Sequence, residues 1–142
     1  LLYRYLDFIS FLALSLQKIA IDKSDIIVFF TDPPLISYAG SFVTLLRHKK
    51  YIIVLQDFFP YTAINTGLIK NKFLFSLLDY QARYFLNNAN AVVVLSEKMR
   101  EFAENMGVKR EKMSIIHNWS DGKSIYPIKK EWFKSVLTIL CL

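Results

Sequence analysis

Four short apolar runs, separated by segments with helical character, are the feature of this sequence that most restricts its fold. The runs, rich in β-branched and aromatic residues, cover residues 26–30, 51–55, 91–95 and 113–116. Continuous apolar runs of this length are typical of strands buried on both faces. Their alternation with helices predicts an α/β fold: an open parallel Rossmann-like sheet with flanking helices on both faces.

The segments between the runs predict the helices. Apolar spacing and boundary residues indicate helices over residues 1–21, 35–47, 72–88 and 97–106. Pro33 and Pro34 end the first strand and favour the start of a helix. Ser96 is a favourable N-cap for the last helix, and Gly107 is a favourable stop. Gly40, inside the second helix, indicates close packing against a neighbouring element.

Charge and composition exclude several classes of function. The net charge is +6, but the basic residues have no zinc-finger, basic-zipper or RNA-binding pattern, so no nucleic-acid partner is expected. Cys141 is the only cysteine, which excludes a disulfide framework and fits a reducing, cytoplasmic compartment. His48 and His117 have no metal-ligand spacing, so no metal is expected. The longest uncharged run of the N-terminal helix, residues 8–17, is too short to cross a bilayer, which takes about 20 residues.

The apolar content leaves room for a further contact surface. Hydrophobic residues make up 54% of the chain, which is high for a small soluble domain. Part of this apolar surface is therefore expected to face a partner domain or a membrane. The lysines and arginines are best explained as a solvated surface, with attraction to an anionic membrane or to phosphate groups as the alternative.

Polar residues follow each predicted strand where it ends. The four pairs are Thr31 and Asp32, Gln56 and Asp57, Ser96 and Glu97, and His117 and Asn118. Because parallel strands end at the same edge of a sheet, the pairs are expected along one rim. Ligands of open α/β sheets bind at that rim. The sequence therefore predicts a binding site there.

Asp57 is the best candidate for a catalytic group at the rim. It follows a buried strand and precedes an aromatic, proline-ended loop that could form a pocket wall. A carboxylate there could orient or deprotonate an acceptor hydroxyl, and Gln56 could hold a substrate hydroxyl. Asp32 is explained equally well as the cap of a turn, and Ser96 is fully explained as an N-cap. His117, a lone histidine at a strand end, is more often a structural or hinge residue.

Glycine usage argues against a nucleotide site built from this chain alone. The sequence has four glycines, at positions 40, 67, 107 and 122. None of them forms the spacing of a dinucleotide-binding loop or a P-loop. No cofactor is therefore expected.

In their order along the chain, these motifs resemble the N-terminal domain of a bacterial GT-B glycosyltransferase. They look most like the family 4 retaining enzymes that build capsule, exopolysaccharide or O-antigen sugars. The resemblance is carried by Thr31, Asp32, Pro33 and Pro34, by Gln56, Asp57, Phe58, Phe59 and Pro60 with Gly67, by residues 91–96, and by His117, Asn118, Trp119, Ser120 and Asp121. Many relatives have histidine at the position of Gln56, and the pair Gln56 and Asp57 is similar to one polysaccharide subgroup.

The resemblance implies a transferase that moves a sugar from a nucleotide-sugar donor to a lipid-linked saccharide acceptor. It implies a cytoplasmic protein, peripheral on the inner face of the plasma membrane. Residues 1–127 would be a partial N-terminal domain with Asp57 as the catalytic group. Asp32, Gln56 and Gly67 would be its acceptor-binding residues.

The resemblance also implies a second domain. His117, Asn118, Trp119 and Asp121 match the hinge at which the chain of the relatives crosses into a donor-binding domain. Neither that domain nor the glycine-rich first strand of the family is recognised here, so residues 128–142 are expected to be a truncated or out-of-frame tail. The chain alone is expected to be inactive, and the strand over residues 26–30 is expected at an exposed sheet edge.

Two alternatives remain open. The chain could be a non-catalytic interaction module that pairs with a separately encoded donor domain. It could also be a basic domain that binds membranes through its apolar N-terminal helix and its lysines. A neighbouring reading frame for the donor domain would favour the first, and salt-sensitive binding to anionic vesicles would favour the second.

Overall fold

A computed structural model of the chain describes residues 2–33 and 35–120. The helices are α1 (Leu2–Ile21), α2 (Ile36–Leu46), α3 (Tyr61–Asn65), α4 (Lys72–Asn88) and α5 (Glu97–Asn105), and the strands are β1 (Ile26–Phe30), β2 (Lys50–Leu55), β3 (Ala91–Val94) and β4 (Met113–Ile115). Every predicted strand and helix is present. The short helix α3 lies where only a loop was predicted. Two backbone hydrogen bonds, from Ile64 to Pro60 and from Ile69 to Ala63, close its first turn and the turn that follows it.

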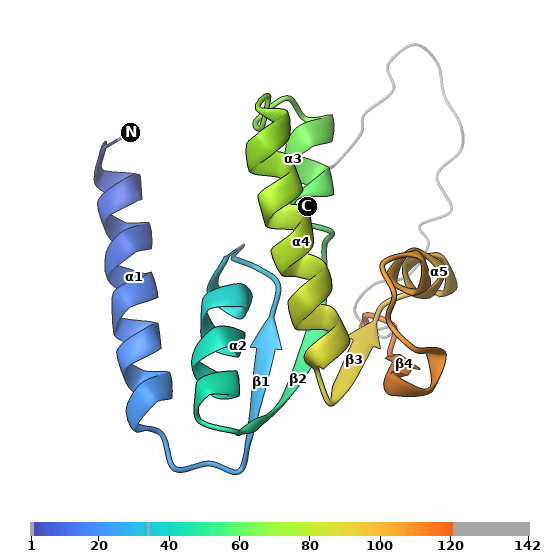
Figure 1. Ribbon diagram of the computed structural model, residues 1–142, viewed down its shortest axis with the longest axis horizontal. Helices are drawn as coiled ribbons and strands as arrows, with labels where there is room; N and C mark the ends of the chain where they lie inside the picture. The colour runs from blue at the N-terminus through green and yellow to red at the C-terminus, as the bar shows by residue number, and fades with distance from the viewer. Residues whose placement is uncertain (1, 34, 121–142) are drawn as a thin grey trace, which may run out of the picture.

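The four strands form one parallel sheet in the order β1-β2-β3-β4 (Figure 1). The register aligns Phe29 with Ile53, Ile53 with Val92, and Val92 with Met113. This confirms the predicted open, parallel, Rossmann-like α/β fold. The strand β1 lies at one edge of the sheet, as expected.

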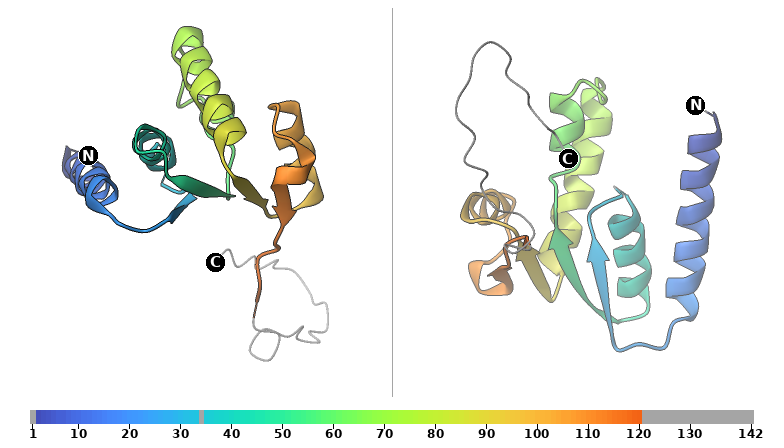
Figure 2. Two further views of the ribbon diagram at one scale, coloured as in Figure 1. Left: turned by 60° about the horizontal axis from the view of Figure 1, so that its bottom comes forward. Right: turned by 180° about the vertical axis from the view of Figure 1, so that it is seen from behind.

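The prediction of helices on both faces of the sheet is wrong for the described residues. Figure 2 shows the helices together on one side of the sheet. The opposite face carries Ile26, Val28 and Phe30, each about half exposed at 51%, 49% and 50%. The reason is the strand order, because right-handed crossovers between successive neighbours place every connecting helix on the same face.

The core lies between the sheet and this helical layer. Its strand residues include Tyr51, Ile53 and Val92, and its helix residues include Phe85 and Leu86 of α4. The Tyr51 hydroxyl donates a hydrogen bond of 2.8 Å to the backbone carbonyl of Phe85. This bond satisfies a polar group that would otherwise be costly to bury.

Local signals at the helix ends agree with the sequence. The Ser96 hydroxyl accepts a hydrogen bond from the Met99 amide, which confirms Ser96 as the N-cap of α5. Gly107 follows that helix with a φ of +100°, in the region that favours glycine. Asn71 caps α4 by accepting bonds from the amides of Phe73 and Leu74.

Gly40 of α2 allows the helix to approach β1, as predicted. A Cβ atom at position 40 would lie 2.2 Å from Cε1 of Phe29. It would also lie 3.1 Å from Cδ1 of Ile19 in α1. One glycine therefore sets the distance between β1, α1 and α2.

Helix α1 packs along α2 and leaves much of its surface to solvent (Figure 1). Among its exposed apolar side chains are Ile9 and Leu14, at 60% and 65%. Within the described part of the chain, no helix combines the length and hydropathy needed to span a bilayer.

Candidate functional site

The ends of β1 and β2 are joined by the side chain of Thr31, which is 4% exposed. Its hydroxyl oxygen accepts hydrogen bonds from the backbone amides of Gln56, at 2.9 Å, and Asp57, at 3.2 Å. The Thr31 amide in turn donates to the carbonyl of Val54. These bonds fix the backbone that carries Gln56 and Asp57 against the end of β1.

The Asp57 carboxylate is in an environment that disfavours its charge. Its Oδ1 atom is buried and has no hydrogen-bond partner among the described residues. Burial raises the pKa of Asp57 above the ordinary value of 3.8, and the nearby Asp32 carboxylate adds to the rise. The Thr31 hydroxyl opposes it. An unpaired, desolvated acceptor is thus held at the carboxyl end of the sheet, where ligands of such folds bind.

The aromatic residues after Asp57 anchor the loop. Phe58 packs on Phe102 of α5, with 4.2 Å between ring centroids. The carbonyl of Phe59 accepts a 2.6 Å hydrogen bond from the Tyr38 hydroxyl of α2. Burial raises the pKa of Tyr38, and the charge of Asp57 raises it further. The loop predicted as a pocket wall is thus held by α2 and α5, which fixes the position of Asp57.

A second polar cluster joins α3 to α4 at the same end of the molecule. The Tyr61 hydroxyl donates to Oδ1 of Asp79 at 2.6 Å, and Arg83 Nε donates to Oδ2 at 2.9 Å. Arg83 also donates to the Tyr61 hydroxyl and to the carbonyl of Asn105. Asp79 is therefore neutralised within the cluster, which ties α3 to α4 and reaches the end of α5.

The other predicted site residues are spread along the rim. Asp32 and Gln56 are exposed beside Asp57. Gly67 follows α3 with a φ of +73°, and a Cβ atom at this position would have no neighbour within 4 Å among the described residues. Thr31 was predicted at the rim, but its hydrogen bonds to Gln56 and Asp57 and the Tyr38 contact were missed in the sequence, because each joins segments more than 20 residues apart.

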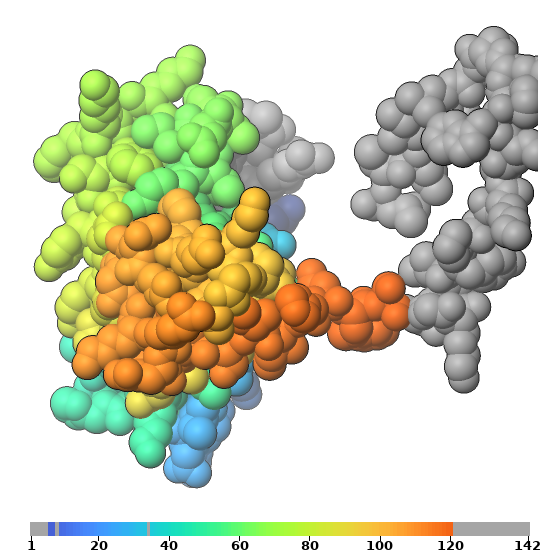
Figure 3. All heavy atoms as spheres, turned by 90° about the vertical axis from the view of Figure 1, so that its right-hand side faces the viewer, coloured from blue at the N-terminus to red at the C-terminus, as the bar shows by residue number. Residues whose placement is uncertain are grey.

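The predicted hinge residues leave the sheet together. The amide of Ile116 continues the ladder by donating to the carbonyl of Val94, and Nδ1 of His117 lies 2.9 Å from the carbonyl of Leu95. The described residues that follow, up to residue 120, extend away from the body (Figure 3). Asn118 is exposed and Trp119 is 90% exposed. Asp121 and the tail 128–142 lie outside the described residues.

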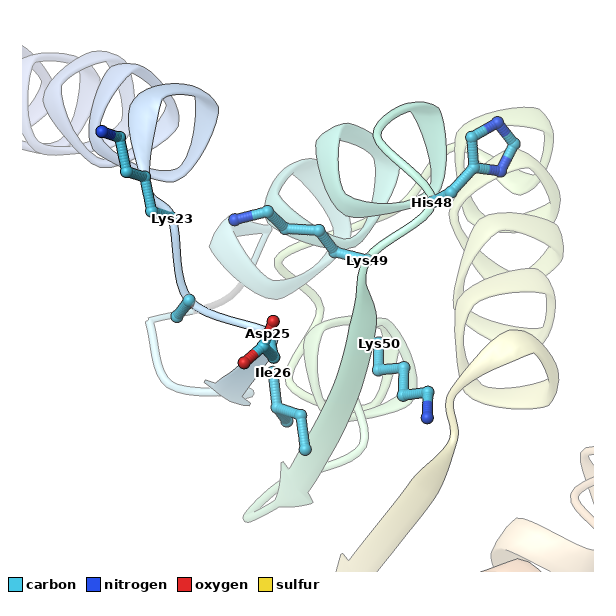
Figure 4. A pocket seen from close by; sticks show the side chains of 7 residues that line it. Lys23, Asp25, Ile26, His48, Lys49 and Lys50 are labelled. Carbon is cyan, nitrogen blue, oxygen red and sulfur yellow. The ribbon is translucent and has the colours of Figure 1, made fainter.

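An open basic cleft lies at the opposite end of the sheet, beside the starts of β1 and β2. Figure 4 shows the side chains of Lys23, His48 and Lys50 pointing in different directions. Lys49 is already bound, because its Nζ donates to the backbone carbonyl of Asp22 and lies 3.6 Å from that residue's carboxylate. The cleft therefore does not present convergent cations to a ligand.

The described residues contain no group of three metal-ligating side chains. The chemistry that the rim can supply is that of the Asp57 carboxylate, with Asp32 and Gln56 as its neighbours. Such a group can accept a hydrogen bond from a hydroxyl and can receive its proton.

Replacing Thr31 tests the role of its hydroxyl in this arrangement. Thr31→Val keeps the shape but leaves the amides of Gln56 and Asp57 without their acceptor, so a loss of about 1–3 kcal/mol in the free energy of unfolding is expected. Thr31→Ser keeps the hydroxyl and is expected to lose less. Urea unfolding measures both variants, and equal stability of the two would contradict the role given to the hydroxyl.

A comparison with protein families gives one match over this region. The family model described as Glycosyltransferase Family 4 matches residues 1–121. The matched range includes all four strands and the whole rim from Thr31 to His117. Comparisons with curated proteins and with solved structures give no match.

Proposed function

Because this chain belongs to glycosyltransferase family 4, we propose that its strand-end rim binds the acceptor in a sugar transfer. The proposed donor is a nucleotide-sugar, and the proposed acceptor is a lipid-linked saccharide. We assign the reaction to bacterial polysaccharide synthesis, of the capsule, exopolysaccharide or O-antigen type. The proposed location is the cytoplasmic face of the plasma membrane.

The unpaired Oδ1 atom of the Asp57 carboxylate is the observation that carries this proposal. This atom has no partner among the described residues and is closed to solvent, so a hydroxyl that displaces the covering atoms would gain a hydrogen bond to a desolvated carboxylate oxygen. A saccharide acceptor brings such a hydroxyl. Bonds to charged groups contribute roughly 1.5–3 kcal/mol, enough to orient the acceptor. As the bond between the donor sugar and its phosphate breaks, the nucleotide leaves with the bonding electrons, the acceptor oxygen forms the glycosidic bond, and Asp57 would take the hydroxyl proton.

The neighbours of Asp57 would complete the acceptor site. Gln56 is exposed next to it and offers both a donor and an acceptor to a second hydroxyl. Asp32 raises the pKa of Asp57 and so increases its tendency to accept a proton. Gly67, after α3, is proposed as a further acceptor contact, and a Cβ atom there would meet no described residue within 4 Å.

The proposed division of labour places the nucleotide-sugar site outside residues 1–127. The absence of a glycine-rich phosphate loop from the sequence supports this division. The hinge role proposed for His117, Asn118, Trp119 and Asp121 supports it as well, since those residues would connect the acceptor part to the donor part.

The isolated 142-residue chain is accordingly expected to bind acceptor without transferring sugar. Charge stabilisation at the donor phosphates is a large part of such catalysis, and the polar pairs at the four strand ends include no lysine or arginine to supply it. Incubation with radiolabelled nucleotide-sugars and a membrane lipid extract measures transfer. Robust sugar transfer by the chain alone would contradict the proposal that the nucleotide-sugar site lies outside residues 1–127. If Asp57→Asn abolished that transfer, the proposed role of Asp57 would still hold.

A second candidate function is a non-catalytic module that pairs with a separate donor domain. The open sheet face of Ile26, Val28 and Phe30 favours it, because apolar surface of this kind is usually covered by a partner. Sedimentation of the chain with a co-expressed donor domain measures the pairing. A chain that stays monomeric in that mixture would exclude this candidate.

A further inference from the structure

A row of exposed apolar and aromatic side chains runs along the solvent side of α4. Phe73, Leu77, Tyr80 and Tyr84 recur at positions i, i+4, i+7 and i+11, so they share one face of the helix. Their exposed fractions are 78%, 50%, 68% and 46%. Leu74, at 43%, adjoins the row on the same helix, and Leu68, at 79%, lies in the segment that precedes α4. These six residues are called the α4 stripe below.

The charged residues in the segment that leads into α4 are all basic. The sequence from Phe58 to Leu78 contains no aspartate or glutamate, and it contains Lys70 and Lys72. Both lysines are exposed, next to the start of α4. The first acidic residue of α4, Asp79, is bound by Arg83. The segment that leads into the apolar row therefore carries two lysines and no carboxylate of its own.

The composition of the α4 stripe changes along the helix. Its purely apolar members, Leu68, Phe73, Leu74 and Leu77, lie toward the N-terminal end, and its tyrosines lie further along. In Figure 1 this N-terminal end of α4 lies beside α3, at the end of the molecule toward which the strand arrows point. Tyrosines favour the headgroup level of a bilayer, whereas leucine and phenylalanine favour its apolar interior.

We propose that the α4 stripe docks this protein on an anionic phospholipid bilayer. The end with Leu68 and Phe73 enters the apolar region, the tyrosines lie among the headgroups, and Lys70 and Lys72 contact the lipid phosphates. This orientation places the rim with Asp57 next to the membrane surface. The docking proposal identifies which surface contacts the membrane. It rests on the proposed function in one respect, which is that the membrane carries the saccharide acceptor.

Vesicle co-sedimentation of the full chain tests the docking. The probes are vesicles of phosphatidylcholine alone and vesicles with phosphatidylglycerol added. We expect binding to the anionic vesicles that weakens with salt, because lysine contacts are screened. Phe73→Ser combined with Leu77→Ser is expected to reduce that binding by at least about 10-fold, and Lys70→Gln with Lys72→Gln is expected to reduce it mainly at low salt.

A matched control is available on α2. Phe42 and Leu46 are exposed at 55% and 66%, so Phe42→Ser with Leu46→Ser removes the same two residue types elsewhere. This variant is expected to bind as the unmodified chain does. Both pairs lie on the surface, and circular dichroism is expected to show an unchanged fold.

Three results would overturn the docking. They are equal vesicle binding by the α4 and α2 variants, equal binding to both kinds of vesicle, and a dimer in solution that the α4 variant converts to a monomer without vesicle binding. The last would assign the α4 stripe to a second copy of the chain. The vesicles contain no saccharide, so vesicle binding tests the docking independently of the proposed function. If the chain binds vesicles but Asp57→Asn leaves saccharide binding unchanged, the proposed function is rejected and the docking is retained.

Discussion

Asp57→Asn is expected to weaken binding of a saccharide acceptor by roughly 10- to 100-fold. The substitution keeps the size of the side chain but removes the charge that a hydroxyl donor meets, and a hydrogen bond to a charged group contributes about 1.5–3 kcal/mol. Isothermal titration of the chain with alkyl-linked mono- and disaccharides measures the change. Glu97→Gln is the control, because Glu97 also follows a strand end but forms ion pairs with Arg100 and Arg110.

The stability of the same variant separates a binding role from a structural one. The pKa of Asp57 is raised in the folded chain, so folding favours the protonated carboxyl. This contribution is present below the unfolded pKa and is lost as the pH rises through the folded pKa. At neutral pH, Asp57→Asn is therefore expected to unfold at the same or a higher urea concentration than the unmodified chain. A clear destabilisation at neutral pH would mean that Asp57 supports the fold.

Gly40→Ala is expected to lower the free energy of unfolding by about 1–3 kcal/mol. The added methyl group would lie 2.2 Å from the Phe29 ring, and overpacking of a core by even one carbon has costs of this size. Because Gly40 sets the distance between α2 and β1, relief by movement of the helix would disturb its contact with α1 as well. Urea unfolding monitored by circular dichroism measures the loss.

A double variant provides the control for this steric argument. Phe29→Leu shortens the side chain that the new methyl group meets, so adding Gly40→Ala to Phe29→Leu is expected to cost less than adding it to the unmodified chain. Non-additivity of this kind is the sign of direct contact. Strictly additive losses in the free energy of unfolding would contradict the steric argument. They would mean that the loss arises within helix α2 and not from contact with Phe29.

The elements of the fold could be predicted from the sequence because each has a local signal: a continuous apolar run for a strand, and apolar spacing with capping residues for a helix. The continuous apolar run of β1 and the capping by Ser96 are local signals, and both are confirmed. The placement of all helices on one face could not be predicted in the same way. It depends on the order of the strands in the sheet, which is set by pairings such as that of Ile26 with Lys50 and not by any local pattern.

The candidate site was predictable only in part for the same reason. That Asp57 follows a strand is visible in the sequence, whereas its orphaned Oδ1 atom and its attachment to Thr31 emerge only once β1 and β2 are side by side. The cluster of Tyr61, Asp79 and Arg83 was missed because its first member lies on the short helix α3, which has too few residues for a periodic signal. The roles of Asp32, Gln56 and Gly67 in acceptor binding stay predictions.

The α4 stripe shows how exposure changes the interpretation of a periodic pattern. The sequence predicts a helix over residues 72–88, and in the structure its inward side includes Ala82 and Phe85, which are buried. The same helix has a second apolar row that faces solvent, which the content of 54% hydrophobic residues indicated only in general terms. The structure assigns part of that excess to one surface.

Acceptor binding at the strand-end rim is the central claim, and nuclear magnetic resonance of the ¹⁵N-labelled chain tests it most directly. Titration with alkyl-linked saccharides is predicted to shift the amides of Thr31, Gln56, Asp57 and Gly67, and Asp57→Asn is predicted to reduce those shifts. A titration that leaves these amides unchanged, or that shifts only amides at the opposite end such as those of His48 and Lys49, would contradict the claim.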